Sequence, residues 1–378
     1  MHKKRNLLVN FLLLFAVIVV FFFAFEVVVR TMKISSGYDY PEGFFQNDEL
    51  LDYVLTPDFE GEFVKQEFTT EIKTNSLGLM DVEYREKKEN DFRILVLGDS
   101  FVWGGYGTTL NQTFVKIVER KLNDLSSKTN YQVINGGIPG YGTDQQLLLL
   151  TEKAYRLDPD LVILSFFVGN DFLNNLETNE LTVIDGVTVS NIPGEKFIEK
   201  LRAFLLLNLH SYRIVEKGAI NMFGDFIQKH ISGIFQQEDY QAGLFLNPIS
   251  KEMKIQYSLT GAILDKMKTY LESSDIRFAL LLIPLKYQVD DGLKEAFVRN
   301  SYGIDEDFDF EIPQKEIIGW GFQNEVVVID LLPQLKSLNN DNDFYWKLNP
   351  HFNVEGNEVV GDIVYNGLVD KSRLITRN

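Results

Sequence analysis

The chain has 378 residues, no cysteine and a formal net charge of −17. Its 45% hydrophobic and 24% charged residues are typical of a folded protein rather than a disordered one. The lack of cysteine excludes disulfides, thiol chemistry and cysteine-based zinc sites, and the negative charge argues against nucleic acid as a partner. The length is sufficient for one large domain or two ordinary ones.

A long apolar run follows a basic N-terminus. Residues 3–5 are all basic, and residues 7–29 hold only two strongly polar side chains, Asn10 and Glu26. As a helix this run would extend roughly 34 Å, enough to cross a hydrocarbon core of about 30 Å. The run therefore predicts a single transmembrane helix, with residues 1–6 in the cytoplasm and the rest of the chain outside the cell membrane. A cleaved signal peptide is the alternative, but no convincing cleavage site follows.

The next part of the chain, residues 30–90, has a mixed composition. It is aromatic and acidic, it is punctuated by glycine and proline, and residues 61–75 alternate in the manner of a strand. We expect a lead-in segment that packs on the main domain.

From residue 91 to about residue 370, short branched-apolar runs alternate with amphipathic helical stretches. Apolar runs of this kind are typical of strands that are buried on both faces of a parallel sheet. The alternation predicts an α/β domain with a doubly wound, five-stranded, mainly parallel sheet and helices on both faces, as in flavodoxin-like folds. The predicted strands are 93–97, 131–135, 160–165, 277–283 and 326–331.

The interval between the third and fourth predicted strands is much longer than the first two. We assign an insertion to about residues 172–250, and residues 194–235 within it resemble helices with an apolar stripe. An insertion packed on the core is the simpler interpretation. A cap over the ligand crevice, or a surface that lies against the bilayer, is the alternative.

Polar, glycine-containing turns follow the first three predicted strands. Ser100 comes after the first strand, Gly140 lies in the turn after the second, and Asn170 follows the third. The carboxyl ends of parallel strands meet at one sheet edge, so two backbone N–H groups and one side-chain amide could surround an oxyanion there. His351, close to the last predicted helix, is the plausible base for Ser100. The other histidines, at positions 2, 210 and 230, lie in the predicted cytoplasmic tail and the insertion.

This arrangement resembles the SGNH, or GDSL, family of serine esterases and acyltransferases, and in particular its membrane-anchored bacterial members. The resemblance extends from about residue 75 to residue 368. Four blocks carry it, and they read Gly98-Asp99-Ser100, Asn135 to Gly140, Gly169-Asn170-Asp171 and Asn349-Pro350-His351. The resemblance implies that Ser100 is the nucleophile, that His351 is the base, and that Gly140 and Asn170 complete an oxyanion hole with the Ser100 N–H. Asp99 and Asp171 are expected to support the loops.

One block departs from the family pattern. Where the family has an aspartate two or three residues before the histidine, this chain has Leu348 and Asn349. An asparagine can hold the imidazole in the correct tautomer if its carbonyl oxygen faces the ring N–H. Asp341, Asp343 or a backbone carbonyl could take the same role.

A simpler interpretation of Ser100 alone is the N-cap of a helix. Separately, the acidic stretch 339–344 could suggest a calcium site, but it lacks the glycine and the terminal glutamate of an EF-hand loop. A solvated loop is the better interpretation of that stretch. The sequence implies no metal and no organic cofactor.

The predicted function is a membrane-anchored serine hydrolase that acts on ester groups, typically O-acetyl groups, through a seryl acyl-enzyme. The substrate would be an acylated carbohydrate or another ester. An O-acyltransferase that works with polysaccharide-modification machinery would use the same residues, so the sequence does not separate the two. A catalytically weak carbohydrate-binding protein is the third class, because Asn349 replaces the usual aspartate.

Overall fold

The computed structural model describes most of the chain. The described ranges are residues 2–31, 40–41, 43–65, 67–175, 181–184, 187–190, 241–301, 307–338 and 343–376, with isolated positions between 205 and 215. The chain divides into two compact units. One comprises Gly43–Glu180 and Gln236–Asn378, and the other comprises Met1–Glu42 and Leu181–Phe235.

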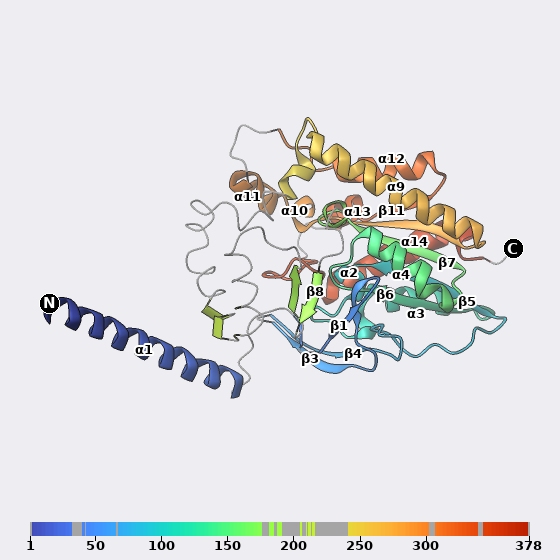
Figure 1. The fold of residues 1–378 in the computed structure, drawn as a ribbon. Coiled ribbons are helices and arrows are strands. Elements are labelled where there is room, and N and C mark those ends of the chain that lie inside the picture. Colours follow the sequence, from blue (N-terminus) through green and yellow to red (C-terminus); the bar gives the residue numbers. More distant parts are fainter. Residues whose placement is uncertain are drawn as a thin grey trace. The chain divides into compact units, whose positions relative to one another are not determined.

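A five-stranded sheet forms the centre of the first unit (Figure 1). Its strand order is β11–β10–β7–β5–β6, and every neighbouring pair is parallel. This arrangement confirms the predicted α/β class and all five predicted strands. The strands are β5 (Asp91–Gly98), β6 (Asn130–Gly137), β7 (Leu161–Phe167), β10 (Arg277–Ile283) and β11 (Val327–Asp330).

Helices cover the sheet in two groups. Helix α3 packs against α14, whereas α4 and α12 both pack against α9. Because crossovers between parallel strands are right-handed as a rule, the change of direction of the chain at β6 puts these two groups on opposite faces of the sheet. Every residue of β5 and β7 is buried as a result, which is why these strands appear in the sequence as apolar runs. The helices are α3 (Phe114–Leu125), α4 (Thr143–Glu152), α9 (Lys251–Ser273), α12 (Ile312–Gln323) and α14 (Val354–Asp370).

The remaining helical elements of this unit lie in the connections and after α14. They are α2 (Ser100–Trp103), η1 (Leu110–Gln112), η2 (Ala154–Leu157), α5 (Asp171–Asn174), η3 (Gly243–Phe245), α10 (Lys286–Val289), α11 (Asp291–Ser301), α13 (Leu332–Leu338) and η4 (Ser372–Leu374).

The strand order contains a topological switch point. From β5 the chain passes to β6 on one side, and it returns to β7 on the other side of β5. In open α/β sheets, ligands bind in the crevice at the carboxyl ends of the strands at such a point. Ser100 comes directly after β5, and Asn170 comes shortly after β7. The fold therefore brings both residues to this crevice.

Two antiparallel hairpins precede the sheet in the chain and belong to the same compact unit. Aromatic side chains join them to the start of the sheet domain. The Phe44 and Phe63 rings lie with their centroids 5.5 and 5.7 Å from that of Trp103, in α2. These ring contacts pack the first hairpins against α2, in the same compact unit as the sheet. The strands are β1 (Phe45–Asp48), β2 (Asp52–Leu55), β3 (Glu60–Val64) and β4 (Thr69–Lys73).

The second unit contains helix α1 (His2–Thr31), which includes the predicted anchor. Its Glu26 side chain is buried, accepting from the Arg30 side chain at 2.6 Å and from the Ser211 backbone N–H at 2.8 Å. Among the residues that the structure describes, no helix has both the length and the apolar character needed to cross a bilayer. The predicted transmembrane helix over residues 7–29 is therefore not supported by this finding.

The predicted helical insertion falls largely outside the described residues, and this includes nearly all of residues 194–235. One described part of the insertion precedes residues 194–235. Residues 181–190 contain a two-stranded antiparallel hairpin of β8 (Leu181–Ile184) and β9 (Val187–Ser190). β-Branched residues such as Val183, Ile184 and Val187 are frequent here and favour a strand over a helix at this position.

Candidate active site

Ser100 is the first residue of the short helix α2 at the end of β5. The N-cap is the preceding residue, Asp99, whose Oδ1 accepts a hydrogen bond from the Phe101 N–H at 2.9 Å. The interpretation of Ser100 as a helix cap is therefore wrong, because Asp99 has that role. The Ser100 hydroxyl is left to interact with other groups.

A chain of hydrogen bonds joins Ser100, His351 and Asn349. The Ser100 Oγ lies 2.7 Å from the His351 Nε2, and the His351 Nδ1 lies 2.6 Å from the Asn349 Oδ1. The same Oδ1 also accepts the backbone N–H of His351 at 3.1 Å. Because the backbone N–H can only donate, the atom that it contacts must be the amide oxygen, which can only accept. The Nδ1 of His351 then carries the ring proton, and its Nε2 is free to accept the Ser100 proton.

The structure distinguishes among the partners that the sequence left open for His351. Asn349 contacts the ring, whereas the Asp343 carboxylate accepts the Tyr345 N–H at 3.3 Å. Asp341 lies outside the described residues. Asn349 is thus the described side chain that orients the imidazole, and it does so without a negative charge.

Aromatic rings surround the His351 imidazole. Tyr106 stacks on it with a centroid distance of 3.6 Å and an interplanar angle of 6°, and the Phe101 ring lies 4.8 Å away. Burial lowers the pKa of His351 from 6.5 to about 3, and the positive charge of Lys65 adds to this shift. Both effects disfavour the imidazolium, so the imidazole is neutral and can accept a proton at any pH near neutrality.

This lowered pKa predicts an unusual titration. The neutral imidazole should persist well below the ordinary histidine pKa of about 6.5, because protonation would place a charge in a desolvated position near the positive charge of Lys65. We expect the ¹³Cε1 resonance of His351, assigned with His351→Gln, to stay unchanged from pH 8 to pH 5 in labelled protein. A midpoint between pH 6 and pH 7 for this resonance would contradict the assigned environment.

The turn after β6 lies directly beside α2. The Ile138 N–H donates to the Gly98 carbonyl at 3.1 Å, and a Cβ added to Gly137 would lie 2.1 Å from the Trp103 nitrogen. Gly140, farther along this turn, has a φ of +86°, and a Cβ added there would lie 2.5 Å from the Tyr53 hydroxyl. Glycine is required at Gly140 on both grounds. The start of the turn therefore lies close to α2.

Asn170 reaches the same place from the end of β7. Its Nδ2 donates to the Asp99 Oδ2 at 3.1 Å, while its Oδ1 is buried and has no hydrogen-bond partner among the described residues. The bond to Asp99 orients the amide so that a second N–H remains for another acceptor. The structure thus links Asn170 to the residue before Ser100.

Two buried carboxyl groups lie beneath these turns. Burial raises the pKa of Asp99 to about 6, although its bonds from Phe101 and Asn170 favour the charged form. Burial also raises the pKa of Asp171 well above its ordinary value, and the nearby charge of Asp99 adds to that shift. The Asp171 Oδ2 accepts the Phe167 N–H at 2.7 Å, which closes the turn that carries Asn170. Both aspartates bind backbone N–H groups of the turns in which they lie.

Sequence reasoning did not identify several residues that contact the site. Tyr106 and Phe101 pack on His351, and Lys65 influences it from the hairpin of β3 and β4. Tyr106 and Phe101 follow Ser100 closely in the chain, so their proximity could have been suspected. Lys65 gave no signal in the sequence.

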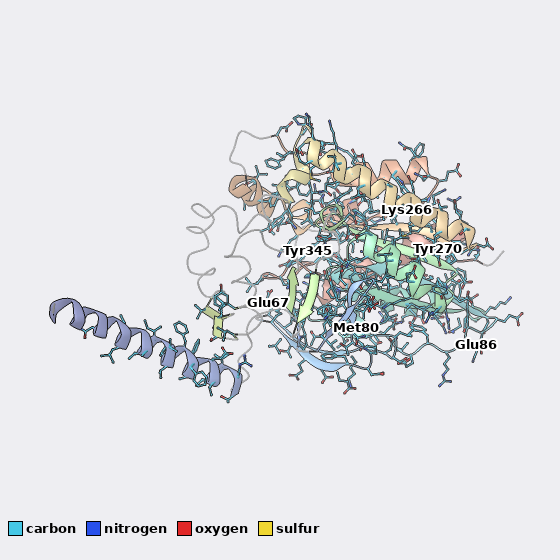
Figure 2. All side chains as sticks on the ribbon, in the orientation of Figure 1. Glu67, Met80, Glu86, Lys266, Tyr270 and Tyr345 are labelled. Carbon is cyan, nitrogen blue, oxygen red and sulfur yellow. The ribbon has the colours of Figure 1, made fainter. Side chains whose placement is uncertain are left out.

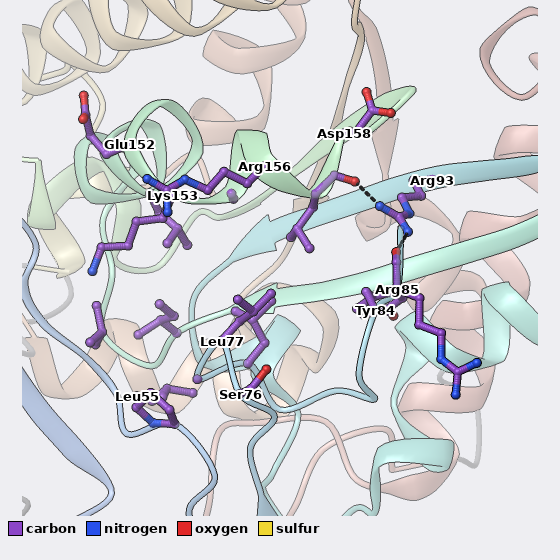
Figure 3. A pocket seen from close by; sticks show the side chains of 18 of the residues that line it. Leu55, Ser76, Leu77, Tyr84, Arg85, Arg93, Glu152, Lys153, Arg156 and Asp158 are labelled. Atoms are coloured by element: carbon purple, nitrogen blue, oxygen red, sulfur yellow. Dashed lines mark hydrogen bonds between the residues drawn. The ribbon is translucent and has the colours of Figure 1, made fainter. Parts of the chain in front are cut away.

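The first unit also contains a cavity of about 820 Å³ away from these residues (Figure 3). Buried leucines form part of its lining, and charged side chains such as Arg85, Lys153 and Arg156 extend around it. Arg93 is held at its wall by hydrogen bonds to the Leu157 and Arg85 carbonyls. Neither Ser100 nor His351 lines this cavity, so the cavity is not part of the candidate active site. Within the described ranges, no cluster of three or more His, Asp or Glu side chains is arranged to hold a metal ion.

Comparison with known proteins gives similarity in structure only. No family model matches the chain, and no curated protein matches its sequence. Among solved structures, a lipase/acylhydrolase from Enterococcus faecalis is similar at 15% identity and a TM-score of 0.41, over 74% of this chain and 96% of the other. An acetyl xylan esterase is 16% identical at a TM-score of 0.40, over 73% and 100% of the two chains. A catalytic mutant of an acetylxylan esterase from Geobacillus stearothermophilus is 11% identical at a TM-score of 0.41, over 73% and 94%.

Proposed function

We propose that this chain is a serine esterase of the SGNH type, with Ser100 as the nucleophile, His351 as the base and Asn349 as the group that orients the base. The observation that carries the proposal is the hydrogen-bond chain from the Ser100 Oγ through the His351 ring to the Asn349 Oδ1, with distances of 2.7 and 2.6 Å. A serine hydroxyl is a weak nucleophile until a neighbouring base removes its proton, and this geometry supplies that base.

The reaction would proceed through an acyl-enzyme. Ser100 Oγ attacks the ester carbonyl while its proton passes to the His351 Nε2. The N–H groups of Ser100 and Gly140 and the Asn170 Nδ2 then stabilise the oxyanion. Collapse of this intermediate breaks the ester bond, and the departing alcohol takes the proton from His351. Water, deprotonated in turn by His351, attacks the acyl-enzyme and releases the carboxylic acid and free Ser100.

We propose an O-acetyl ester of a carbohydrate as the substrate, following the family resemblance of the four sequence blocks. The test is the release of acetate from acetylated xylo-oligosaccharides and of nitrophenol from 4-nitrophenyl acetate by the purified protein. Turnover of both esters with stoichiometric acetate supports a hydrolase. Transfer of the acetyl group to an added unacetylated oligosaccharide would assign the O-acyltransferase instead. If no acetate and no transfer product form but oligosaccharide binding is measurable, the result would favour the carbohydrate-binding protein.

We propose a cell-membrane location with the sheet domain outside the cytoplasm. Support comes from the basic residues 3–5 ahead of the apolar run 7–29, and from exposed apolar side chains on α1 such as Val20 and Phe23. The chain has no cysteine, so a single cysteine introduced into the sheet domain is a specific label. Reaction of intact cells with a membrane-impermeant maleimide supports this location, and reaction only after lysis contradicts it.

A further inference from the structure

The loop that carries Asn349 and His351 is a turn held together mainly at its base. Tyr345 and Phe352 form an antiparallel bridge, and the Trp346 N–H donates to the His351 carbonyl at 3.1 Å. The tip of the turn is at the surface, where the Leu348 side chain is 67% exposed. A turn of this kind needs external contacts if its imidazole is to keep a fixed position.

Glu67 supplies such a contact from a distant part of the sequence. It lies in the loop between β3 and β4, within the lead-in segment (Figure 2). Its Oε1 accepts the backbone N–H of Lys347 at 2.9 Å, and its Oε2 accepts that of Leu348 at 2.8 Å. One carboxylate thus binds two successive N–H groups at the tip of the turn. Hydrogen bonds to a charged acceptor are stronger than neutral ones.

The hairpin that carries Glu67 is itself fixed against the site. Phe68 packs against Trp346 with a centroid distance of 5.1 Å, and the Thr70 Oγ1 accepts the Gly107 N–H at 2.9 Å. The Trp346 indole N–H donates to the Tyr106 carbonyl at 2.8 Å, and Tyr106 is the ring that stacks on His351. The hairpin therefore contacts both the loop that carries the base and the segment that contains Tyr106.

We propose that Glu67 is a positioning residue for His351, and that it sets the distance between the Nε2 and the Ser100 Oγ by holding the tip of the 346–351 turn. This inference rests on the proposed function. A displacement of about 1 Å in a reacting group can cost about 10²-fold in rate, so a carboxylate that never touches the substrate can have a large effect. It also gives the hairpin of the lead-in segment an indirect role in catalysis, exerted through the loop that carries His351.

The experiment compares Glu67→Ala, Glu67→Gln and the matched control Glu71→Gln in full-length protein. Glu71 is an exposed glutamate on β4, where it pairs with Glu62 of β3. We expect Glu67→Ala to lower kcat for 4-nitrophenyl acetate about 10-fold with KM within about 2-fold. Glu67→Gln, which keeps one carbonyl acceptor, should lose about 3-fold, and Glu71→Gln should equal the parent. If Glu67→Ala does not fold, Glu67→Gln carries the comparison.

Two further measurements separate positioning from a general structural role. In a His351→Ala background, Glu67→Ala should cause no further loss of the residual activity, because the group it positions is gone. The proton resonance of the His351 Nδ1–H should be sharp in the parent and broadened by exchange in Glu67→Ala. Equal losses in both backgrounds, or an unchanged resonance, would overturn the inference. The resonance reports on Glu67 even if Ser100 does not react with a fluorophosphonate, which is the result that would defeat the proposed function.

Discussion

Ser100→Ala is expected to abolish both ester hydrolysis and covalent labelling by a fluorophosphonate. The Ser100 Oγ lies 2.7 Å from a neutral imidazole, so it should be the serine that forms a stable phosphonyl adduct. Removal of a triad residue leaves only the contribution of the oxyanion hole and of binding. We expect kcat/KM for 4-nitrophenyl acetate to fall at least about 10³-fold. The adduct is located by mass spectrometry of a peptide that contains residue 100.

His351→Ala should cause a loss of similar size, and the double variant should lose little more. When two residues act as one unit, the effects of their substitutions on the rate are far from additive, because removal of either residue disables the same step. Ser273→Ala is the matched control, since this serine is exposed near the end of α9 and its hydroxyl donates to the Tyr270 carbonyl. Persistent hydrolysis in Ser100→Ala, or an adduct on another serine, would show that the proposed nucleophile is wrong.

Much of the fold could be predicted from the sequence, for a physical reason. A parallel strand between two layers of helices is buried on both faces. The strands β5, β7 and β10 therefore each appear in the sequence as an apolar run, which is easily distinguished from a turn. The order of strands within the sheet is not visible in such runs. It becomes apparent only in the pairing of β5 with both β6 and β7, which places Ser100 and Asn170 on the same crevice.

The site itself was only partly predictable. Ser100, Asn170 and His351 stood out because each belongs to a short polar block, and the structure brings Ser100 and His351 into contact. The partner of His351 could not be chosen, since aspartates and an asparagine precede it and only the shape of the turn decides which side chain reaches the ring. The contact of Glu67 could not be predicted either, because 281 residues separate it from its partner Leu348. Contacts of that range depend on tertiary packing rather than on any local pattern.

Asn349→Asp should make the enzyme faster. In trypsin-like proteases the reverse change, from aspartate to asparagine, costs about 10⁴ in turnover because it favours the wrong tautomer. Here the Asn349 Oδ1 already holds the correct tautomer, so the native site lacks only the negative charge that stabilises the imidazolium. A charged acceptor strengthens a hydrogen bond by about 1–2 kcal/mol, which corresponds to roughly 10-fold in rate. Asp is nearly the same size as Asn and can accept the same two N–H groups.

The direction of the pH response gives this prediction a second readout. A carboxylate at position 349 favours the charged imidazole, so the pKa of His351 should rise from its low value toward the ordinary range. The variant should therefore be faster at pH 8 yet lose activity as the pH falls through the new pKa, whereas the parent does not. Asn349→Ala should be slower than the parent by at least about 10-fold, because nothing then fixes the tautomer. If Asn349→Ala were as active as the parent, another group would have to orient His351. If Asn349→Asp were slower, the prediction would be wrong. Asparagine would then be the better partner for His351, and we would conclude that the site is adapted to a neutral imidazole.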